Sequence, residues 1–153
     1  MREIKFKGYG IRGKEWHYGF VYNYVTCRDG VAVEHYAIQL KESKEKLITD
    51  NNMFEVEEAS IGQYTGFKDK NGVEIYEGDI VEYVSDTLKN EDNKVFIVEW
   101  ETETNNGWLI RNYNYPDETA VDNEHLSYWL NDYIGLQSEV VGNIYEEKLK
   151  EGK

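Results

Sequence analysis

Short segments of alternating apolar and polar residues recur along the chain, and turn-forming residues separate them. Phe54–Glu57 and Ile80–Val84 are two such segments, and Val95–Trp100 is the strongest. Alternation with a period of two places successive side chains on opposite faces of a β-strand. One proline and thirteen glycines among 153 residues suit an ordered fold with frequent turns. The pattern predicts a mainly β protein built as a small barrel or sandwich.

The first forty residues are expected to form an opening strand and a hairpin. Ile4–Phe6 alternates and is followed by the aromatic segment Glu15–Tyr22. Gly19 interrupts this segment, which indicates a bulge or a close approach of another backbone. Asp29–Gly30 is a hairpin-turn dipeptide, and it lies between the expected strands Tyr22–Cys27 and Val31–Leu40.

The second half carries further turn and strand signals. Asp69–Gly72 is a predicted turn, because Asn and Gly both tolerate positive φ. Gly78–Asp79 is a second turn. Asn106–Gly107 precedes the predicted strand Trp108–Tyr113, and Val140–Tyr145 is expected to be the closing strand.

Residues 120–133 leave helix and strand open. An edge strand over residues 125–130 fits the composition. Apolar residues at helical spacing favour a helical turn instead, with Asp122 or Asn123 as its N-cap. These apolar residues are Leu126, Trp129, Leu130 and Tyr133.

The net charge of −13 is unevenly distributed. Residues 1–50 contain nine Lys/Arg and seven Asp/Glu, a sum of +2, whereas residues 51–153 contain eight and twenty-three, a sum of −15. A protein that binds duplex DNA concentrates positive charge on one face. Direct nucleic-acid binding is therefore not expected. An acidic surface that imitates a DNA phosphate track and occupies a nucleic-acid-binding protein is an alternative.

Several features lead us to expect a cytoplasmic protein. No apolar run approaches the roughly 20 residues that span a bilayer, and Met1–Lys7 leads into no apolar signal region. We therefore expect no contact with a membrane. Cys27 is the single cysteine, so a disulfide within the chain is not possible. We expect Cys27 to be a small buried apolar residue.

Searches for catalytic, cofactor and metal signatures identify no site. His17, His35 and His125 are far apart, and none lies near another His or Cys at metal-ligand spacing. Gly8–Gly10 lacks the strand–loop–helix context of a phosphate loop. Acidic pairs such as Glu57–Glu58 are typical of a solvated face. We expect no cofactor and no enzyme activity, and an unrecognised hydrolase or nuclease is the weaker alternative.

Aromatic side chains are abundant on the predicted strands, and core packing is the first interpretation for them. An aromatic patch at the surface would instead serve protein contact. The candidates for such contact are Trp16, Tyr18 and Trp108.

The segment Gly62–Val81 closely resembles the signature of the YopX family, small proteins encoded by phages and prophages, mainly of Gram-positive bacteria. Met1–Phe6 with Gly13–Gly19 is similar to the family's first strand pair, and Glu139–Glu146 to its last strand. Phe67 stands where leucine is more usual, and the end of the chain lacks the family's Asn-Pro-Glu-Leu. The signature residues are Gly62, Tyr64, Thr65, Gly66, Asp69, Gly72, Ile75, Tyr76, Gly78, Asp79 and Val81.

The resemblance implies a β-rich fold with a small SH3-like barrel and no established activity. We expect an N-terminal β lobe over residues 1–58, the barrel over 59–146 with at most a short helix, and a frayed tail over 147–153. Gly66, Gly72 and Gly78 would serve turns, Asp79 would cap a strand entry, and Ile75, Ile80 and Val81 would enter the core. A loop shaped for a partner is the alternative interpretation of the signature.

These observations lead to one functional hypothesis. The chain is expected to be a phage or prophage accessory protein that acts by contact with an unknown protein partner or by self-assembly into a homo-oligomer. The acidic DNA mimic remains the alternative.

Overall fold

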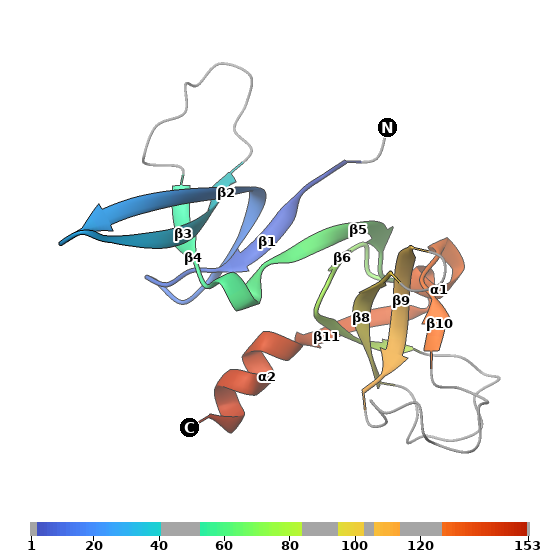
Figure 1. The fold of residues 1–153 in the computed structure, drawn as a ribbon. Helices are drawn as coiled ribbons and strands as arrows, with labels where there is room; N and C mark the ends of the chain where they lie inside the picture. Colours follow the sequence, from blue (N-terminus) through green and yellow to red (C-terminus); the bar gives the residue numbers. More distant parts are fainter. Residues whose placement is uncertain (1–2, 41–52, 84–94, 103–105, 114–126, 153) are drawn as a thin grey trace. The chain divides into compact units, whose positions relative to one another are not determined.

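The computed structural model describes residues 3–40, 53–83, 95–102, 106–113 and 127–152. Strands dominate these residues, and the α-helices are two short segments (Figure 1). The predicted mainly β class is confirmed. The chain divides into two compact units, Met1–Tyr64 and Thr65–Lys153. Their boundary falls inside Gly62–Val81, whereas the sequence placed it after Glu58.

The first unit is an antiparallel sheet whose strands follow the order β4-β3-β2-β1-β5. A single 3-10 turn, η2 (Glu58–Ser60), connects β4 to β5. The strands are β1 (Phe6–Tyr9), β2 (Trp16–Arg28), β3 (Val31–Leu40), β4 (Met53–Val56) and β5 (Gly62–Lys68), whose last residues belong to the second unit.

Two predicted glycine positions shape the hairpin of β2 and β3. Asp29 and Gly30 have φ values of 54° and 79°, as a two-residue turn between Arg28 and Val31 requires. A Cβ added at Gly19 would collide with the backbone carbonyl oxygen of Gln39. The close backbone approach expected at Gly19 is therefore confirmed.

β2 and β3 are longer than the strands that flank them. β1 pairs with β2 only from Trp16 to Gly19, and β4 pairs with β3 only from Tyr36 to Gln39. The rest of the hairpin extends beyond both neighbours as a two-stranded ribbon, drawn in blue in Figure 1. We call residues 20–35 the ribbon.

The second unit is built on an antiparallel five-stranded sheet with the order β10-β9-β8-β7-β11. Among the strands that the structure describes this sheet is open, so the closed SH3-like barrel that the resemblance implied is not observed. Strand β6 (Glu74–Tyr76) pairs with β5 beside it. The sheet strands are β7 (Asp79–Tyr83), β8 (Val95–Glu101), β9 (Gly107–Asn112), β10 (Ser127–Trp129) and β11 (Ser138–Asn143).

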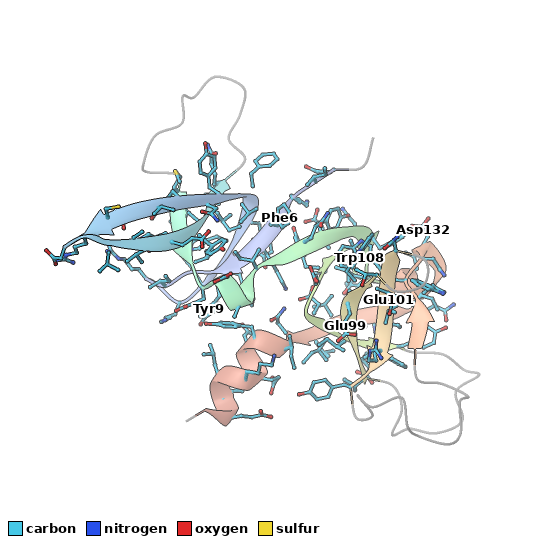
Figure 2. The ribbon with its side chains drawn as sticks, in the orientation of Figure 1. Phe6, Tyr9, Glu99, Glu101, Trp108 and Asp132 are labelled. Carbon is cyan, nitrogen blue, oxygen red and sulfur yellow. The ribbon has the colours of Figure 1, made fainter. Side chains whose placement is uncertain are left out.

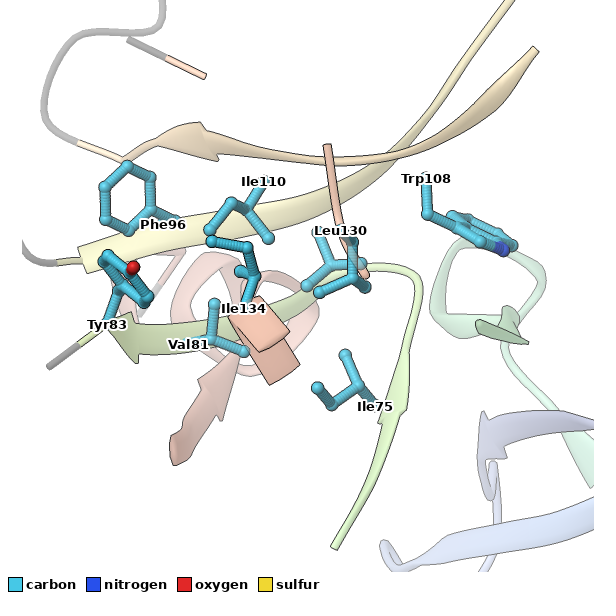
Figure 3. Close-up of a cluster of buried hydrophobic side chains, with 9 residues drawn as sticks. Ile75, Val81, Tyr83, Phe96, Trp108, Ile110, Leu130 and Ile134 are labelled. Atoms are coloured by element: carbon cyan, nitrogen blue, oxygen red, sulfur yellow. The ribbon is translucent and has the colours of Figure 1, made fainter. Parts of the chain in front are cut away.

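The core of the second unit lies on one face of this sheet. Alternate residues of β8, Phe96 and Val98, are fully buried, as are Val81 and Ile110 on the neighbouring strands. Figure 3 shows these side chains together with Trp108 at one end of the cluster. Ile75, Ile80 and Val81 of the signature are all buried, as predicted.

Four expectations about the C-terminal part were wrong. The favoured helical turn near residues 125–133 is not observed over Ser127–Trp129, which form an edge strand, the alternative that the sequence left open. Helix α1 (Asp132–Leu136) follows, capped by Asn131 Oδ1, which accepts from Ile134 N at 3.0 Å. Asp122 and Asn123, the predicted caps, lie outside the described residues.

The expected closing strand ends at Asn143, and the tail predicted to be frayed is helix α2 (Ile144–Glu151). Asn143 Oδ1 accepts from Tyr145 N at 2.9 Å and so begins α2, and an ion pair joins Glu147 to Lys150 within it. The two helices exceed the single short helix that we expected.

Candidate functional site

One face of the ribbon and of β2 before it carries a continuous set of exposed apolar side chains. Side chains two residues apart on β2 share a face, and the pairing of Arg28 with Val31 extends that face onto β3. Their exposed fractions range from 36% to 61%. We call this set the aromatic face: Tyr18, Phe20, Tyr22, Tyr24, Val31 and Val33.

A cavity of about 500 Å³ lies beside Tyr24. Ala37, Met53 and Phe54 give it apolar walls. Its polar groups include the guanidinium of Arg12, which forms no ion pair with another described residue, and Glu55. The cavity therefore combines an apolar interior with a cation.

His17 forms another wall of this cavity. It is buried, and its ring stacks on Phe54 at a centroid distance of 4.0 Å. A Cβ at Gly10 would lie 2.8 Å from His17 Nε2, so the glycine leaves room for the imidazole. Packing accounts for His17 without a metal or a reaction.

His35 links three strands of the first unit. Its Nε2 lies 2.8 Å from Thr26 Oγ1 on β2, and its Nδ1 lies 2.6 Å from Glu55 Oε1 on β4. Tyr24 stacks on the same imidazole at 5.0 Å. Sequence reasoning missed this array, because cross-strand register brings together residues that are 9 and 20 positions apart.

The order hydroxyl, imidazole, carboxylate matches that of a nucleophilic triad. Such a triad also requires oxyanion donors and an environment that excludes water. Thr26 lies instead on an exposed part of the ribbon, between the exposed residues Val25 and Cys27. The array therefore fits a cross-strand connection that holds the ribbon to β4.

Two turns of the signature lie in the second unit, whereas Gly66, which was expected to serve a turn, lies within strand β5 with a φ of 92°. The carboxylate of Asp69, 1% exposed, accepts three backbone hydrogen bonds: Oδ1 from Asn71 N and Val73 N, both at 2.8 Å, and Oδ2 from Val140 N at 3.1 Å. Gly72 has a φ of 81°, as the predicted turn requires. Asp69 thus connects this turn to β11.

The second signature turn is also held by a buried carboxylate that accepts a backbone hydrogen bond. Asp79 Oδ2 accepts from Tyr76 N at 2.8 Å, and Gly78 has a φ of 78°. Thr65 Oγ1 donates to Ile75 O at 2.7 Å and joins β5 to β6. Each of these polar side chains has backbone partners, so the structural interpretation accounts for the signature without a ligand.

Lys70 adds an exposed ion pair to the first turn. Its Nζ lies 2.5 Å from Glu139 Oε2 on β11. The hydrogen bond to Glu139 raises the pKa of Lys70 above its ordinary value. This ion pair joins the first signature turn to β11, the same two segments that the hydrogen bonds of Asp69 join.

The three predicted contact aromatics have different environments. Tyr18 belongs to the aromatic face. Trp16 is half-buried, with Lys7 Nζ 4.5 Å from its ring centroid and Tyr9 packed edge-on. Trp108 is 5% exposed within the core of the second unit, so it was wrongly assigned to a contact surface.

Other aromatics and Cys27 also depart from expectation. Tyr22, predicted to pack in the core, is exposed, and Phe20 and Tyr24 were not among the contact candidates. Cys27, expected to be buried, is exposed on the ribbon. The sequence signal for the aromatic face was the alternation Tyr18, Phe20, Tyr22, Tyr24, which does not by itself distinguish an inner from an outer face.

The comparison with known protein families covers residues of both units. The model of the YopX protein family matches residues 14–149. The chain belongs to the YopX family. This match includes both turns held by Asp69 and Asp79 and the whole of the ribbon.

Comparisons with individual proteins add less. The search of curated proteins finds no match for this YopX protein. Among solved structures, protein EF1440 from Enterococcus faecalis is similar, with 18% sequence identity over 97% of each chain and a TM-score of 0.46. No described helix of this chain has the length and apolar character needed to cross a membrane.

Proposed function

We propose that this YopX protein is a phage or prophage accessory protein of the host cytoplasm, and that it acts by protein–protein contact and without catalysis. The observation that supports the proposal is the aromatic face. Six exposed apolar side chains lie side by side on it, whereas exposed apolar residues of monomeric proteins are usually scattered. Aromatic residues are enriched at the core of protein interfaces, and Tyr is among the residue types that contribute most to binding there.

The charges around this face indicate the chemistry of the partner. Arg28 lies on the same face, opposite Val31, and Arg12 lines the adjoining cavity. Glu55, the carboxylate in this cavity, is held by His35 at 2.6 Å. An apolar segment with an acidic side chain therefore complements the face: its apolar residues would pack on Tyr22 and Tyr24, and its carboxylate would reach Arg12.

Photocrosslinking in a lysogenic host tests this proposal. A photoreactive phenylalanine at position 22 is expected to capture a partner, and the same group at position 25, on the opposite face, is the matched control. The captured protein is then purified, and its binding to wild type is compared with binding to Phe20→Ser/Tyr22→Ser and to Arg12→Ala.

We expect the double variant to weaken binding at least tenfold while its circular dichroism matches that of wild type. Arg12→Ala should weaken binding less and reduce its dependence on salt. Equal capture at positions 22 and 25 of a protein other than a second copy of the chain, or full affinity of the double variant, would refute the aromatic face as the contact site.

The acidic DNA mimic remains a second candidate, and one observation favours it. The second unit contains eight Lys/Arg and twenty Asp/Glu, a sum of −12, against nine and ten, a sum of −1, in the first unit. The outer face of its sheet gathers four carboxylates, of which Figure 2 labels Glu99 and Glu101; the other two are Glu82 and Glu139.

Two cations weaken this candidate. Arg111 Nε lies 2.8 Å from Glu99 and Lys70 lies beside Glu139, so the carboxylates do not form an uninterrupted anionic track. The mimic predicts that duplex DNA displaces a captured DNA-binding protein, and that Glu82→Gln/Glu99→Gln/Glu101→Gln releases it. Release of the captured protein by the Phe20→Ser/Tyr22→Ser substitutions instead would favour the aromatic face.

A further inference from the structure

The outer edge of β2 is open along most of its length. Within the described part of the chain, β1 is the strand on this side, and its pairing ends at Gly19. Among the described strands, β2 pairs with β3 alone from Phe20 to Arg28. A two-stranded ribbon of this kind is marginally stable in water, and further strands stabilise it.

This edge lacks the features with which proteins block unwanted strand pairing. Open edges usually carry charged residues, a proline or a bulge. Phe20–Cys27 contains no charged residue and no proline, and its register with β3 is continuous. Aromatic and β-branched residues, which favour strands, make up six of its eight positions: Phe20, Val21, Tyr22, Tyr24, Val25 and Thr26.

The register identifies the backbone groups at this edge. The two-residue turn makes Arg28 and Val31 a hydrogen-bonded pair, and alternate residues back along β2 then direct their N–H and C=O groups to β3. The residues between them direct theirs outward. Asn23, Val25 and Cys27 therefore present to a further strand backbone donors and acceptors with which no described strand pairs.

We propose that this edge pairs antiparallel with the same edge of a second copy of the chain. Two-fold pairing about Tyr24 places Val21–Cys27 against itself, with Asn23 opposite Val25, so no like charges meet within the stretch, and each Arg28 lies beyond it. The first unit has a net charge of −1, whereas the second has −12. Contact through the ribbon joins the two copies at their least charged parts.

The opposite edge of the ribbon suits this role less. On β3, the stretch that β4 leaves open is Val31–His35, and it includes the charged residue Glu34. His35 is already connected to Glu55 on β4 at 2.6 Å. The β2 edge is longer and uncharged.

Pairing at the β2 edge would also determine where the aromatic faces of the two copies lie. In a continuous antiparallel sheet with a two-fold axis perpendicular to it, equivalent faces of the two copies point to the same side. The aromatic faces would therefore become adjacent and could bind two partner segments. The edge pairing itself does not depend on what the aromatic face binds.

Sedimentation equilibrium and hydrogen exchange of the full chain test this proposal. Wild type is expected to approach the mass of two chains as concentration rises. Val25→Pro removes an outward N–H without removing a bond to β3, and it should weaken dimerisation at least tenfold. Val25→Thr keeps the N–H and the β-branched shape, and it should dimerise as wild type does.

Hydrogen exchange in the wild type does not depend on how the variants fold. Raising the concentration is expected to slow exchange at Asn23, Val25 and Cys27 at least tenfold, with little change at Tyr22, Tyr24 and Thr26, which already bond to β3. A monomer at all concentrations would overturn the proposal, as would a dimer without this alternation. Phe20→Ser/Tyr22→Ser should still dimerise, which separates failure here from failure of the partner-binding proposal.

Discussion

Asn143 Nδ2 donates a hydrogen bond to Asp79 Oδ1 at 3.1 Å, and both side chains are buried although 64 positions separate them in the chain. The other carboxylate oxygen of Asp79 accepts from Tyr76 N. Asn143 in turn begins helix α2 through its own Oδ1. One pair therefore connects the second signature turn, the last strand and the C-terminal helix.

Substitution of this pair is expected to destabilise the second unit. Asp79→Ala leaves Tyr76 N and Asn143 Nδ2 buried without their acceptor, so the free energy of unfolding should fall by about 3 kcal/mol. Urea unfolding measures the change. Glu82→Ala, an exposed carboxylate on the same strand, is the control and should change stability by less than about 0.5 kcal/mol.

The coupling between the two residues can be measured separately. A double-mutant cycle with Asp79→Ala and Asn143→Ala is expected to give an interaction free energy of about 1–2 kcal/mol. Additive effects of the two substitutions would contradict a direct bond between them.

Asp69 is expected to stabilise the first signature turn as strongly as Asp79 stabilises the second. Asp69→Ala removes the acceptor of three backbone N–H groups and should lower stability by about 3 kcal/mol, and Asp69→Asn, which keeps one acceptor oxygen, by about half of that. Native-state hydrogen exchange provides a local test: the amide of Val140 should exchange faster in both variants. Unchanged exchange there would show that Oδ2 does not hold β11.

Gly19 is expected to tolerate no side chain. In Gly19→Ala the new Cβ would overlap the backbone carbonyl of Gln39, so β2 and β3 must separate locally. Stability of the first unit should fall by about 2–3 kcal/mol. Gly142→Ala is the control, because its Cβ would lie 3.9 Å from Ile80 Cδ1, an ordinary contact. Thermal unfolding of both variants compares the two positions.

The ion pair of Lys70 and Glu139 predicts a pH dependence with a definite sign. Glu139 raises the pKa of Lys70 in the folded chain above its ordinary value of 10.5. The stabilisation is therefore complete below pH 10.5 and is lost as the pH rises through the folded pKa. A double-mutant cycle with Lys70→Met and Glu139→Gln should show coupling at pH 7 and none above the folded pKa. Coupling that persists there would disprove the assignment.

The strands and turns of this protein are largely encoded in local sequence. Alternation predicted β8 and β9, and Asp29–Gly30 and Asp69–Gly72 predicted turns that the structure contains, because these residues tolerate positive φ wherever they occur. The signature Gly62–Val81 is contiguous in the chain, so its resemblance to the YopX family is visible in the sequence. Such signals act over a few residues and do not depend on contacts between distant segments.

Near the C-terminus, contacts with distant segments determine whether a segment forms a helix or a strand. Ser127–Trp129 has apolar neighbours at helical spacing, yet it forms β10 because the free edge of β9 pairs with it. α2 was missed, because its cap, Asn143, was assigned to a strand that continued to Tyr145.

Local sequence is sufficient to establish that this protein is mainly β, that its signature turns involve Asp69 and Asp79, and that it resembles the YopX proteins. Which face of each strand is covered depends on how the sheets pack. Period-two alternation is the same for an inner and an outer face. It therefore cannot show that Trp108 is in the core while Phe20 and Tyr22 are at the surface, or that Cys27 lies on an open edge.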